Sequence, residues 1–291
     1  MSERPDDTPP DVRASTALHA PTSSVTDGAE APRPHATATA APEARSACPS
    51  DMVEVDEVCI DRFEAHLLED LPDGQSRLFP HYQRPRAGVR YRAANGRAVF
   101  PQSYISRTEA AAACDAADKR LCTRTEWQRA CRHRRTGVFP YAGSGRPGAC
   151  NTGKAHLLPI LFPEQGYRFR YDEHFNNPAL SQTRGFLAPA GAFDQCATDL
   201  GAYDMVGNLH EWVSDTVTSA LIASLETDGV RRQWQPGSPG NAVFVGGFYS
   251  TQNEHGPGCA FITVAHESSY HDYSTGFRCC KTSRPLAPAA P

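Results

Sequence analysis

The stretch Gly201-Ala202-Tyr203-Asp204-Met205-Val206-Gly207-Asn208-Leu209-His210-Glu211-Trp212 is the most informative part of this 291-residue chain. It combines a Gly207-Asn208 turn with two carboxylates, Asp204 and Glu211, and with apolar residues between and after them. Carboxylates interleaved with glycine and backbone carbonyls form the kind of oxygen-rich loop that calcium favours. An ordinary turn ahead of a buried tryptophan is the alternative, and these residues alone leave both interpretations open.

The composition is that of a globular protein, with 40% hydrophobic and 21% charged residues. A net charge of -4 and a pI near 6.3 indicate neither a nucleic acid nor an anionic membrane as partner. No apolar run approaches the ~18 residues that a membrane-spanning helix needs. We therefore expect no nucleic-acid partner and no transmembrane segment.

The chain has ten cysteines, an even and rather high number. None forms a Cys-x-x-Cys pair and no histidine pair has zinc-finger spacing, so structural zinc is not expected. Ten cysteines most simply predict five disulfides and an oxidising compartment. The first thirty residues lack the basic start and apolar core of a secretory signal. We favour export to the periplasm or the medium with a start codon further upstream; reduced thiols in the cytoplasm are the alternative.

Composition also predicts the domain boundaries. Residues 1–47 consist mainly of Pro, Ala, Thr, Ser and Asp, which cannot bury enough apolar surface to offset the entropy of ordering. We predict a disordered arm over 1–47, one domain over 48–284 and a loose Pro/Ala-rich tail over 285–291.

Order is expected to begin at Cys48. The alternating residues 52–60 around Asp56-Glu57 predict a hairpin, which Cys48 and Cys59 bracket closely enough to form a disulfide. Residues 66–98 lack clear periodicity and are interpreted as surface loops, whose arginines form a solvated face. Asp61 and Glu64 are expected at the surface or in hydrogen-bonding positions.

Two helix starts are well marked. Ser106-Arg107-Thr108-Glu109 and Thr123-Arg124-Thr125-Glu126 both have the capping-box pattern. Helical spacing then places Cys114 on the inward face of the first helix and Cys131 on that of the second.

The second half of the domain has fewer local signals. Residues 137–201 are rich in Gly, Pro and Asn, which predicts long irregular chain that needs reinforcement, with Cys150 and Cys196 as candidates for a disulfide. Residues 216–240 look like a variable insertion. Buried strands are expected over 243–249 and 276–280.

Five fragments occur in an order typical of one family: Cys59-Ile60-Asp61-Arg62-Phe63-Glu64, Lys119-Arg120-Leu121-Cys122-Thr123-Arg124-Thr125-Glu126-Trp127, Asp204 to Trp212, Gly246-Gly247 and Gly276-Phe277-Arg278. This series resembles the formylglycine-generating enzyme family, also called the sulfatase-modifying factor domain. The resemblance covers nearly all of 48–284. It implies an α+β fold of the C-type-lectin-like variant, with a small twisted antiparallel sheet, two helices and long irregular loops.

The resemblance also implies three disulfides. Family members join the cysteine ending the first helix to that of the final GFRC strand, here Cys114–Cys279. They join the cysteine late in the second helix to one about twenty residues before that strand, here Cys131–Cys259. Cys122–Cys280 would be an additional pair.

The departure from the family concerns copper. The family oxidases hold cuprous copper with two cysteines, five residues apart, shortly after the Gly-Gly pair, and convert a substrate cysteine to an aldehyde. Residues 246–258 of this chain contain no cysteine, and Phe248 stands where the family has serine. Copper and formylglycine formation are therefore not expected, and whether the chain is an enzyme stays open.

Another family branch resembles iron-dependent sulfoxide synthases, whose histidine ligands are shared with a separate helical domain. A private iron or other transition-metal site here would use His255, His266 and His271, which the sequence equally allows to be polar loop residues. The resemblance implies structural calcium as well, with Asp204 and Glu211 supplying side-chain oxygens and Gly207 and Leu209 supplying carbonyls. A second calcium site would begin at Asn151.

The expected function is that of an exported, disulfide-stabilised binding or accessory domain, a monomer that presents loops to an unknown protein or peptide ligand. The alternatives are a metal-dependent, non-haem oxidoreductase of the same family and, less favoured, a true formylglycine-generating oxidase that acts on sulfatase cysteines.

Overall fold

The hairpin expected at residues 52–60 is present in the computed structural model of the chain. Strands β1 (Met52–Val55) and β2 (Val58–Asp61) pair antiparallel, and Asp56 makes the turn at a φ of 54°. The structure describes residues 48–132, 137–141, 143–227, 238–252 and 255–283, which belong to one compact unit. The predicted arm over 1–47 and the tail over 285–291 lie outside the described residues.

Strands β1 and β2 belong to the first of three small sheets, which has the strand order β1-β2-β11-β6. The second sheet has the order β10-β7-β8-β9 and the third the order β4-β3-β5. The pairing is antiparallel except between β10 and β7, which run parallel. The strands not yet located are β3 (Ala65–Asp70), β4 (Ser76–Leu78), β5 (Tyr91–Asn95), β6 (Arg120–Leu121), β7 (His210–Thr216), β8 (Ala242–Val245), β9 (Ile262–Thr263), β10 (Thr275–Phe277) and β11 (Cys279–Thr282).

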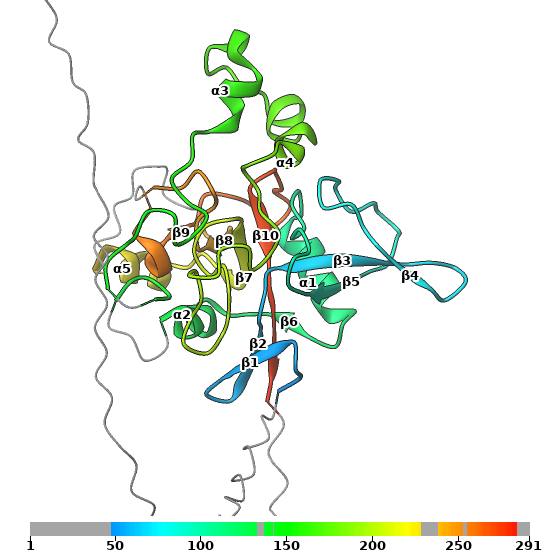
Figure 1. Cartoon of the computed structure of the whole chain (residues 1–291), viewed down its shortest axis with the longest axis vertical. Helices are drawn as coiled ribbons and strands as arrows, with labels where there is room; N and C mark the ends of the chain where they lie inside the picture. Colours follow the sequence, from blue (N-terminus) through cyan, green and yellow to red (C-terminus); the bar gives the residue numbers. More distant parts are fainter. Residues whose placement is uncertain (1–47, 133–136, 142, 228–237, 253–254, 284–291) are drawn as a thin grey trace, which may run out of the picture. The chain divides into compact units, whose positions relative to one another are not determined.

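Both predicted helices form with the predicted caps (Figure 1). Helix α1 (Arg107–Asp115) has Ser106 and Glu109 in a reciprocal capping box. Helix α2 (Arg124–Arg132) has the same arrangement, because Thr123 N donates to Glu126 and Glu126 N donates to the Thr123 hydroxyl. Each box satisfies two amide groups that the first helical turn leaves unpaired.

Several elements were not expected. Residues 66–98, interpreted as loops, contain most of the third sheet. Arg77, Arg86, Arg90 and Arg92 pair there with Glu69 and Asp70 of β3. The region interpreted as an insertion contains helix α5 (Ser219–Thr227). The irregular region carries α3 (Leu157–Leu161), the 3₁₀ turn η1 (Pro163–Gln165), the π-helix η2 (Tyr171–Phe175) and α4 (Ala179–Gln182), and η3 (Gly258–Ala260) precedes β9.

The predicted final strand is divided in two. Residues 275–277 pair with β7 and residues 279–282 pair with β2 and β6, so Arg278 lies between two sheets. In Figure 1 this red segment runs between the β1–β2 hairpin and strands β7 and β8. The terminal segment thereby joins the two sheets.

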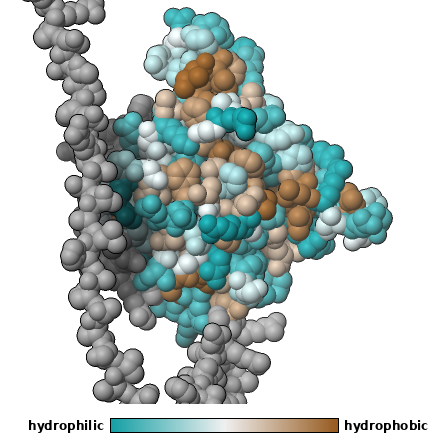
Figure 2. Space-filling view, in the orientation of Figure 1, coloured by the Kyte–Doolittle hydropathy of each residue, from teal (hydrophilic) through white to brown (hydrophobic). Residues whose placement is uncertain are grey.

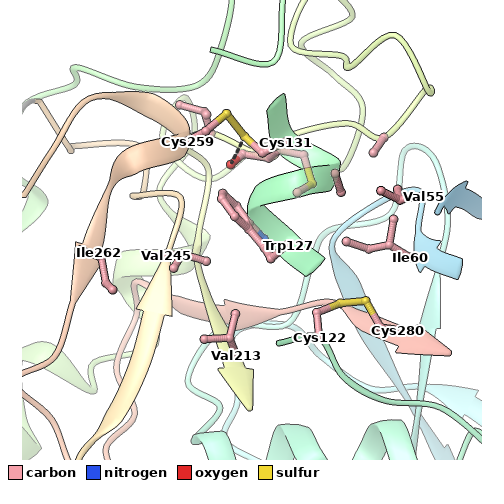
Figure 3. Close-up of a cluster of buried hydrophobic side chains, with 14 of the residues drawn as sticks. Val55, Ile60, Cys122, Trp127, Cys131, Val213, Val245, Cys259, Ile262 and Cys280 are labelled. Atoms are coloured by element: carbon pink, nitrogen blue, oxygen red, sulfur yellow. Dashed lines mark hydrogen bonds between the residues drawn. A yellow bond between two sulfur atoms is a disulfide. The ribbon is translucent and has the colours of Figure 1, made fainter. Parts of the chain in front are cut away.

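Five disulfides reinforce this loop-rich structure: Cys48–Cys59, Cys114–Cys279, Cys122–Cys280, Cys131–Cys259 and Cys150–Cys196. These are the five pairs that the sequence and the resemblance led us to expect. Figure 3 shows Trp127 of α2 between the Cys131–Cys259 and Cys122–Cys280 bridges, among buried Val213 and Val245. The bridges therefore fasten α2 to the core.

Apolar side chains also reach the surface. Figure 2 shows hydrophobic residues on the upper part of the molecule, where α3 lies, and there Ile160 is 51% exposed. No helix among the described residues is long and apolar enough to span a membrane.

Candidate functional site

The stretch from Gly201 to Trp212 folds as a turn with positive φ angles, followed by strand β7. Asp204 and Asn208 have positive φ angles of 55° and 58°, a region that asparagine and aspartate tolerate better than most residues. Gly207 is required there, because a Cβ would lie 2.2 Å from the Asn151 carbonyl oxygen. The turn is thus tied to the irregular region that precedes it.

Glu211 follows this turn and is completely buried. Its carboxylate accepts two hydrogen bonds from Arg278, Nε to Oε2 and Nη2 to Oε1, each 2.6 Å long. Trp127 Nε1 donates a third bond of 2.6 Å to Oε2. Arg278 also donates to the carbonyls of Asp61 and Tyr203, so this one ion pair connects α2, β7 and the break between β10 and β11.

Two further buried carboxylates lie close to this pair. Glu64 accepts hydrogen bonds from Leu209 N at 3.0 Å and Asn208 Nδ2 at 2.5 Å. Asp204 accepts one from Gly191 N at 2.6 Å. The residues Glu64, Asp204 and Glu211 are all at most 3% exposed, and all three interact with the buried guanidinium of Arg278. Asp204 interacts with the exposed Arg97 as well.

The pKa values of Glu64 and Asp204 are both raised in this acidic group. Burial, together with the charges of Asp204 and Glu211, raises the pKa of Glu64 well above its usual range. Burial also raises the pKa of Asp204 to about 6, although Gly191 N and Arg278 act in the opposite direction. The sequence predicted Glu64 at the surface or in a hydrogen-bonding position. It is buried and hydrogen-bonded, and its place in this acidic group was not predicted.

The donor set suits a hard cation. Asp204 and Glu211 are 3% and 1% exposed, and a divalent ion would offset their buried negative charge. Glu211 would contribute a carboxylate that already binds a guanidinium. Both oxygens of Glu211 accept hydrogen bonds from Arg278, and Oε2 accepts one from Trp127 as well, so a calcium ion on this carboxylate would lie beside a guanidinium.

Asn151 Oδ1, the atom that a metal ion would use, is buried and has no hydrogen-bond partner among the described residues. Asn151 Nδ2 donates to Asn208 Oδ1 and to the Phe186 carbonyl, each at 2.8 Å. The ammonium group of Lys154 donates to the same Phe186 carbonyl at 2.9 Å. A cationic side chain is therefore already present beside Asn151.

The three histidines proposed as metal ligands have different surroundings. His271 Nδ1 lies 2.7 Å from Asn176 Oδ1, whereas His266 stacks on Tyr270 with ring centroids 3.8 Å apart. His255 contacts the edge of Phe261 at 5.5 Å. Over the described part of the chain, no three His, Cys, Asp or Glu side chains form a group that could hold a metal ion.

His210 is the histidine that the sequence did not single out. It is 7% exposed, stacks on Phe261 at 5.1 Å and contacts Phe244 at 4.5 Å. Burial lowers its pKa well below the usual value, and His255, His266 and His156 add to the effect. Its buried Nδ1 has no hydrogen-bond partner among the described residues.

A depression of about 460 Å³ lies over the β9–β10 loop. Its wall includes the Tyr171 ring from η2, and π-helical turns are frequent at functional sites. The Tyr171 hydroxyl donates to the His271 carbonyl at 2.6 Å, and the ring centroids of Tyr171 and Tyr270 lie 5.3 Å apart. The other lining residues are Arg84, Ala265, His266, Glu267, Ser269 and His271.

The position expected for copper has no thiolate. Residues 246–258 lack cysteine, and Cys259, the nearest, is bonded to Cys131. All ten cysteines lie in the described part of the chain and all are in disulfides. Phe248, in place of the family serine, contacts His210 with ring centroids 4.9 Å apart.

Solved structures similar to this chain are distant in sequence. PvdO from Pseudomonas aeruginosa is 17% identical, with a TM-score of 0.44 over 77% of this chain and 80% of that one. CarF is 15% identical, with a TM-score of 0.44 over 82% and 95%. The variable protein 1 of Treponema denticola is 11% identical, with a TM-score of 0.44 over 81% and 100%.

A search of curated proteins finds no match. The sequence model of one family, described as the sulfatase-modifying factor enzyme 1-like domain, matches residues 28–283. With its C-type-lectin-like arrangement of small sheets, helices and long loops, this chain belongs to the sulfatase-modifying factor enzyme 1-like family.

Proposed function

We propose that this chain is a family member without copper chemistry, working as a monomeric binding or accessory domain for a protein or peptide. The observation that carries the proposal is the state of the cysteines. Each of the ten is in a disulfide, so none supplies the thiolate that cuprous copper needs.

The depression beside the β9–β10 loop is the surface that best suits a peptide. It offers the rings of Tyr171 and Tyr270 and the guanidinium of Arg84, residue types enriched where binding energy concentrates. Tyr171 is anchored through its hydroxyl to the backbone of His271, so its ring loses little freedom on binding.

A conversion assay tests the absence of oxidase activity. The purified protein is incubated with cuprous copper, oxygen and a Cys-x-Pro-x-Arg peptide, beside an active formylglycine-generating enzyme. We expect no aldehyde product by mass spectrometry. Conversion at a rate comparable with the control enzyme would overturn the proposal.

Selection from a displayed random-peptide library tests the binding surface. Peptides enriched on the wild-type protein should lose at least tenfold in affinity on Tyr171→Ala, about 1.4 kcal/mol. Tyr167→Ala is the matched control, because Tyr167 is 82% exposed and does not line the depression. Equal binding by both variants would place the ligand elsewhere.

A metal-dependent oxidoreductase is the second candidate. It is favoured by the buried His210 Nδ1, which has no hydrogen-bond partner among the described residues, and by the electrostatic interaction of His210 with His255 and His266. Neutral imidazoles suit iron and copper. Elemental analysis of protein purified without chelators decides between the candidates. Bound iron that is lost on His266→Ala would support an oxidoreductase, and protein free of iron, copper and zinc would support the binding domain.

We also propose a structural calcium ion on Asp204 and Glu211, with the carbonyls of Gly207 and Leu209. The buried surplus of negative charge around Arg278 supports it. When bound, calcium would supply charge compensation, while the chain's own groups hold the turn in place.

We further propose that the chain is exported. Five disulfides are typical of proteins from an oxidising environment. Thiol titration of protein from its native host, denatured without reductant, should detect no free thiols; ten would contradict export.

A further inference from the structure

Lys154 lies in a cage of backbone oxygens, unlike an ordinary surface lysine. Its ammonium donates to the Gly185 carbonyl at 2.7 Å and to the Phe186 carbonyl at 2.9 Å. The Phe193 ring adds a third side, with its centroid 5.7 Å from Nζ. Two carbonyl dipoles and an aromatic face together form a cation-binding environment.

This cage is connected to the turn before β7. Asn151 Nδ2 donates to the same Phe186 carbonyl and also to Asn208 Oδ1. Asn208 in turn donates to Glu64, which belongs to the acidic group around Arg278. We refer to Asn151, Lys154, Gly185 and Phe186 as the Asn151 junction.

The Asn151 junction resembles a cation site in which the cation is the ammonium group of Lys154. Calcium takes six to eight oxygen ligands at about 2.3–2.6 Å, and anionic oxygens supply most of the affinity. The Asn151 junction offers only neutral oxygens. Two of its carbonyls already accept hydrogen bonds from an ammonium group, and the buried Asn151 Oδ1 has no hydrogen-bond partner among the described residues. A metal ion bound to the Gly185 and Phe186 carbonyls would be strongly repelled by the Lys154 ammonium, which is hydrogen-bonded to the same two oxygens.

We infer that Lys154 is a built-in cation that takes the place of a metal ion at the Asn151 junction, which therefore does not bind calcium. The ammonium fastens the segment around Phe186 to Asn151 and, through Asn208, to the turn before β7. This inference concerns the stability of the loops and is independent of the proposed function.

Substitutions at Lys154 test the role of the charge. Lys154→Met keeps the apolar stem and removes the ammonium, and should lower Tm by about 4 °C or more. Lys154→Arg keeps a cation and should recover most of the loss. Arg168→Met is the control, because Arg168 is exposed, and should change Tm by about 1 °C or less.

Three results would overturn the inference: Lys154→Met as stable as the wild type, Lys154→Arg as destabilised as Lys154→Met, or calcium bound at the Asn151 junction. Isothermal titration with calcium alone examines the third. In Asp204→Asn, shown to be folded by circular dichroism, we expect no calcium binding tighter than about 1 mM. Binding that persists there and disappears on adding Asn151→Ala would place calcium at the Asn151 junction.

Discussion

Arg278 illustrates how much a single residue contributes to this fold. It is 1% exposed and forms a two-pronged ion pair with Glu211, while its remaining donors bind backbone carbonyls. A charge this deeply buried is tolerated only because every donor group finds an acceptor. The pair therefore specifies how β7 and the β10–β11 segment meet.

Glu211→Gln should be strongly destabilising. It removes the carboxylate that is hydrogen-bonded to the buried Arg278 guanidinium, and breaking a buried ion pair costs about 3–5 kcal/mol of unfolding free energy. Asp118→Asn is the control, because the Asp118 side chain is 89% exposed in its pair with Lys281, and it should cost about 1 kcal/mol or less. Urea unfolding measures both free energies. Equal losses in the two variants would show that the buried ion pair contributes no more to stability than the exposed one.

His210 should make the protein sensitive to acid. Because its pKa is lowered in the folded state, the unfolded chain binds more protons than the folded chain below about pH 6.5, so stability falls as pH falls through that value. His210→Phe keeps a ring between Phe244 and Phe261 and removes the titrating group.

The expected result for His210→Phe is a gain in Tm over the wild type that is larger at pH 5.5 than at pH 8. Calorimetry at the two pH values measures this difference. A gain that does not depend on pH would mean that His210 does not titrate on unfolding.

At the scale of elements, α2 is held by covalent and polar contacts together. Its Trp127 donates to Glu211, and its Cys131 is bonded to Cys259 across a sequence separation of 128 residues. Cys48–Cys59, by contrast, closes only 11 residues. A crosslink that closes a longer loop removes more conformational entropy from the unfolded chain.

Removing Cys131–Cys259 by two alanine substitutions should therefore cost more than removing Cys48–Cys59. The loop-closure relation gives a difference of about 2 kcal/mol in unfolding free energy. Denaturant titration of the two double variants is the measurement. If the Cys48–Cys59 variant loses as much, native packing rather than loop length determines the contribution.

At the scale of the whole molecule, bound calcium is expected to raise the thermal stability of the fold. If it compensates the buried charge of Glu64, Asp204 and Glu211, chelation should lower Tm by several degrees and added calcium should restore it. Asp204→Asn should make Tm insensitive to chelation. A wild-type Tm that chelation leaves unchanged contradicts the calcium proposal.

Local patterns in the sequence were sufficient for elements that form over a few residues. The capping boxes at Ser106 and Thr123 correctly predicted where α1 and α2 begin, because both partners of each box lie within one helical turn. The hairpin over 52–60 was predicted for the same reason. The third sheet was missed because its central strand, β3, buries three consecutive residues, Ala65 to Leu67, and so lacks the alternation on which strand prediction depends.

The sequence alone determined the family and the helix starts, because these depend on short motifs, their order and their spacing. Three of the five cysteine pairs followed only from the resemblance to the family. Only the tertiary structure decided which charged groups meet. Glu64 reaches Asn208 across 144 residues, Arg278 reaches Glu211 across 67, and Lys154 reaches Phe186 across 32. Such pairs depend on how sheets and loops close on one another, and no local periodicity encodes that. The stretch from Gly201 to Trp212 was therefore recognisable from its residues, but the acidic group that surrounds it was not.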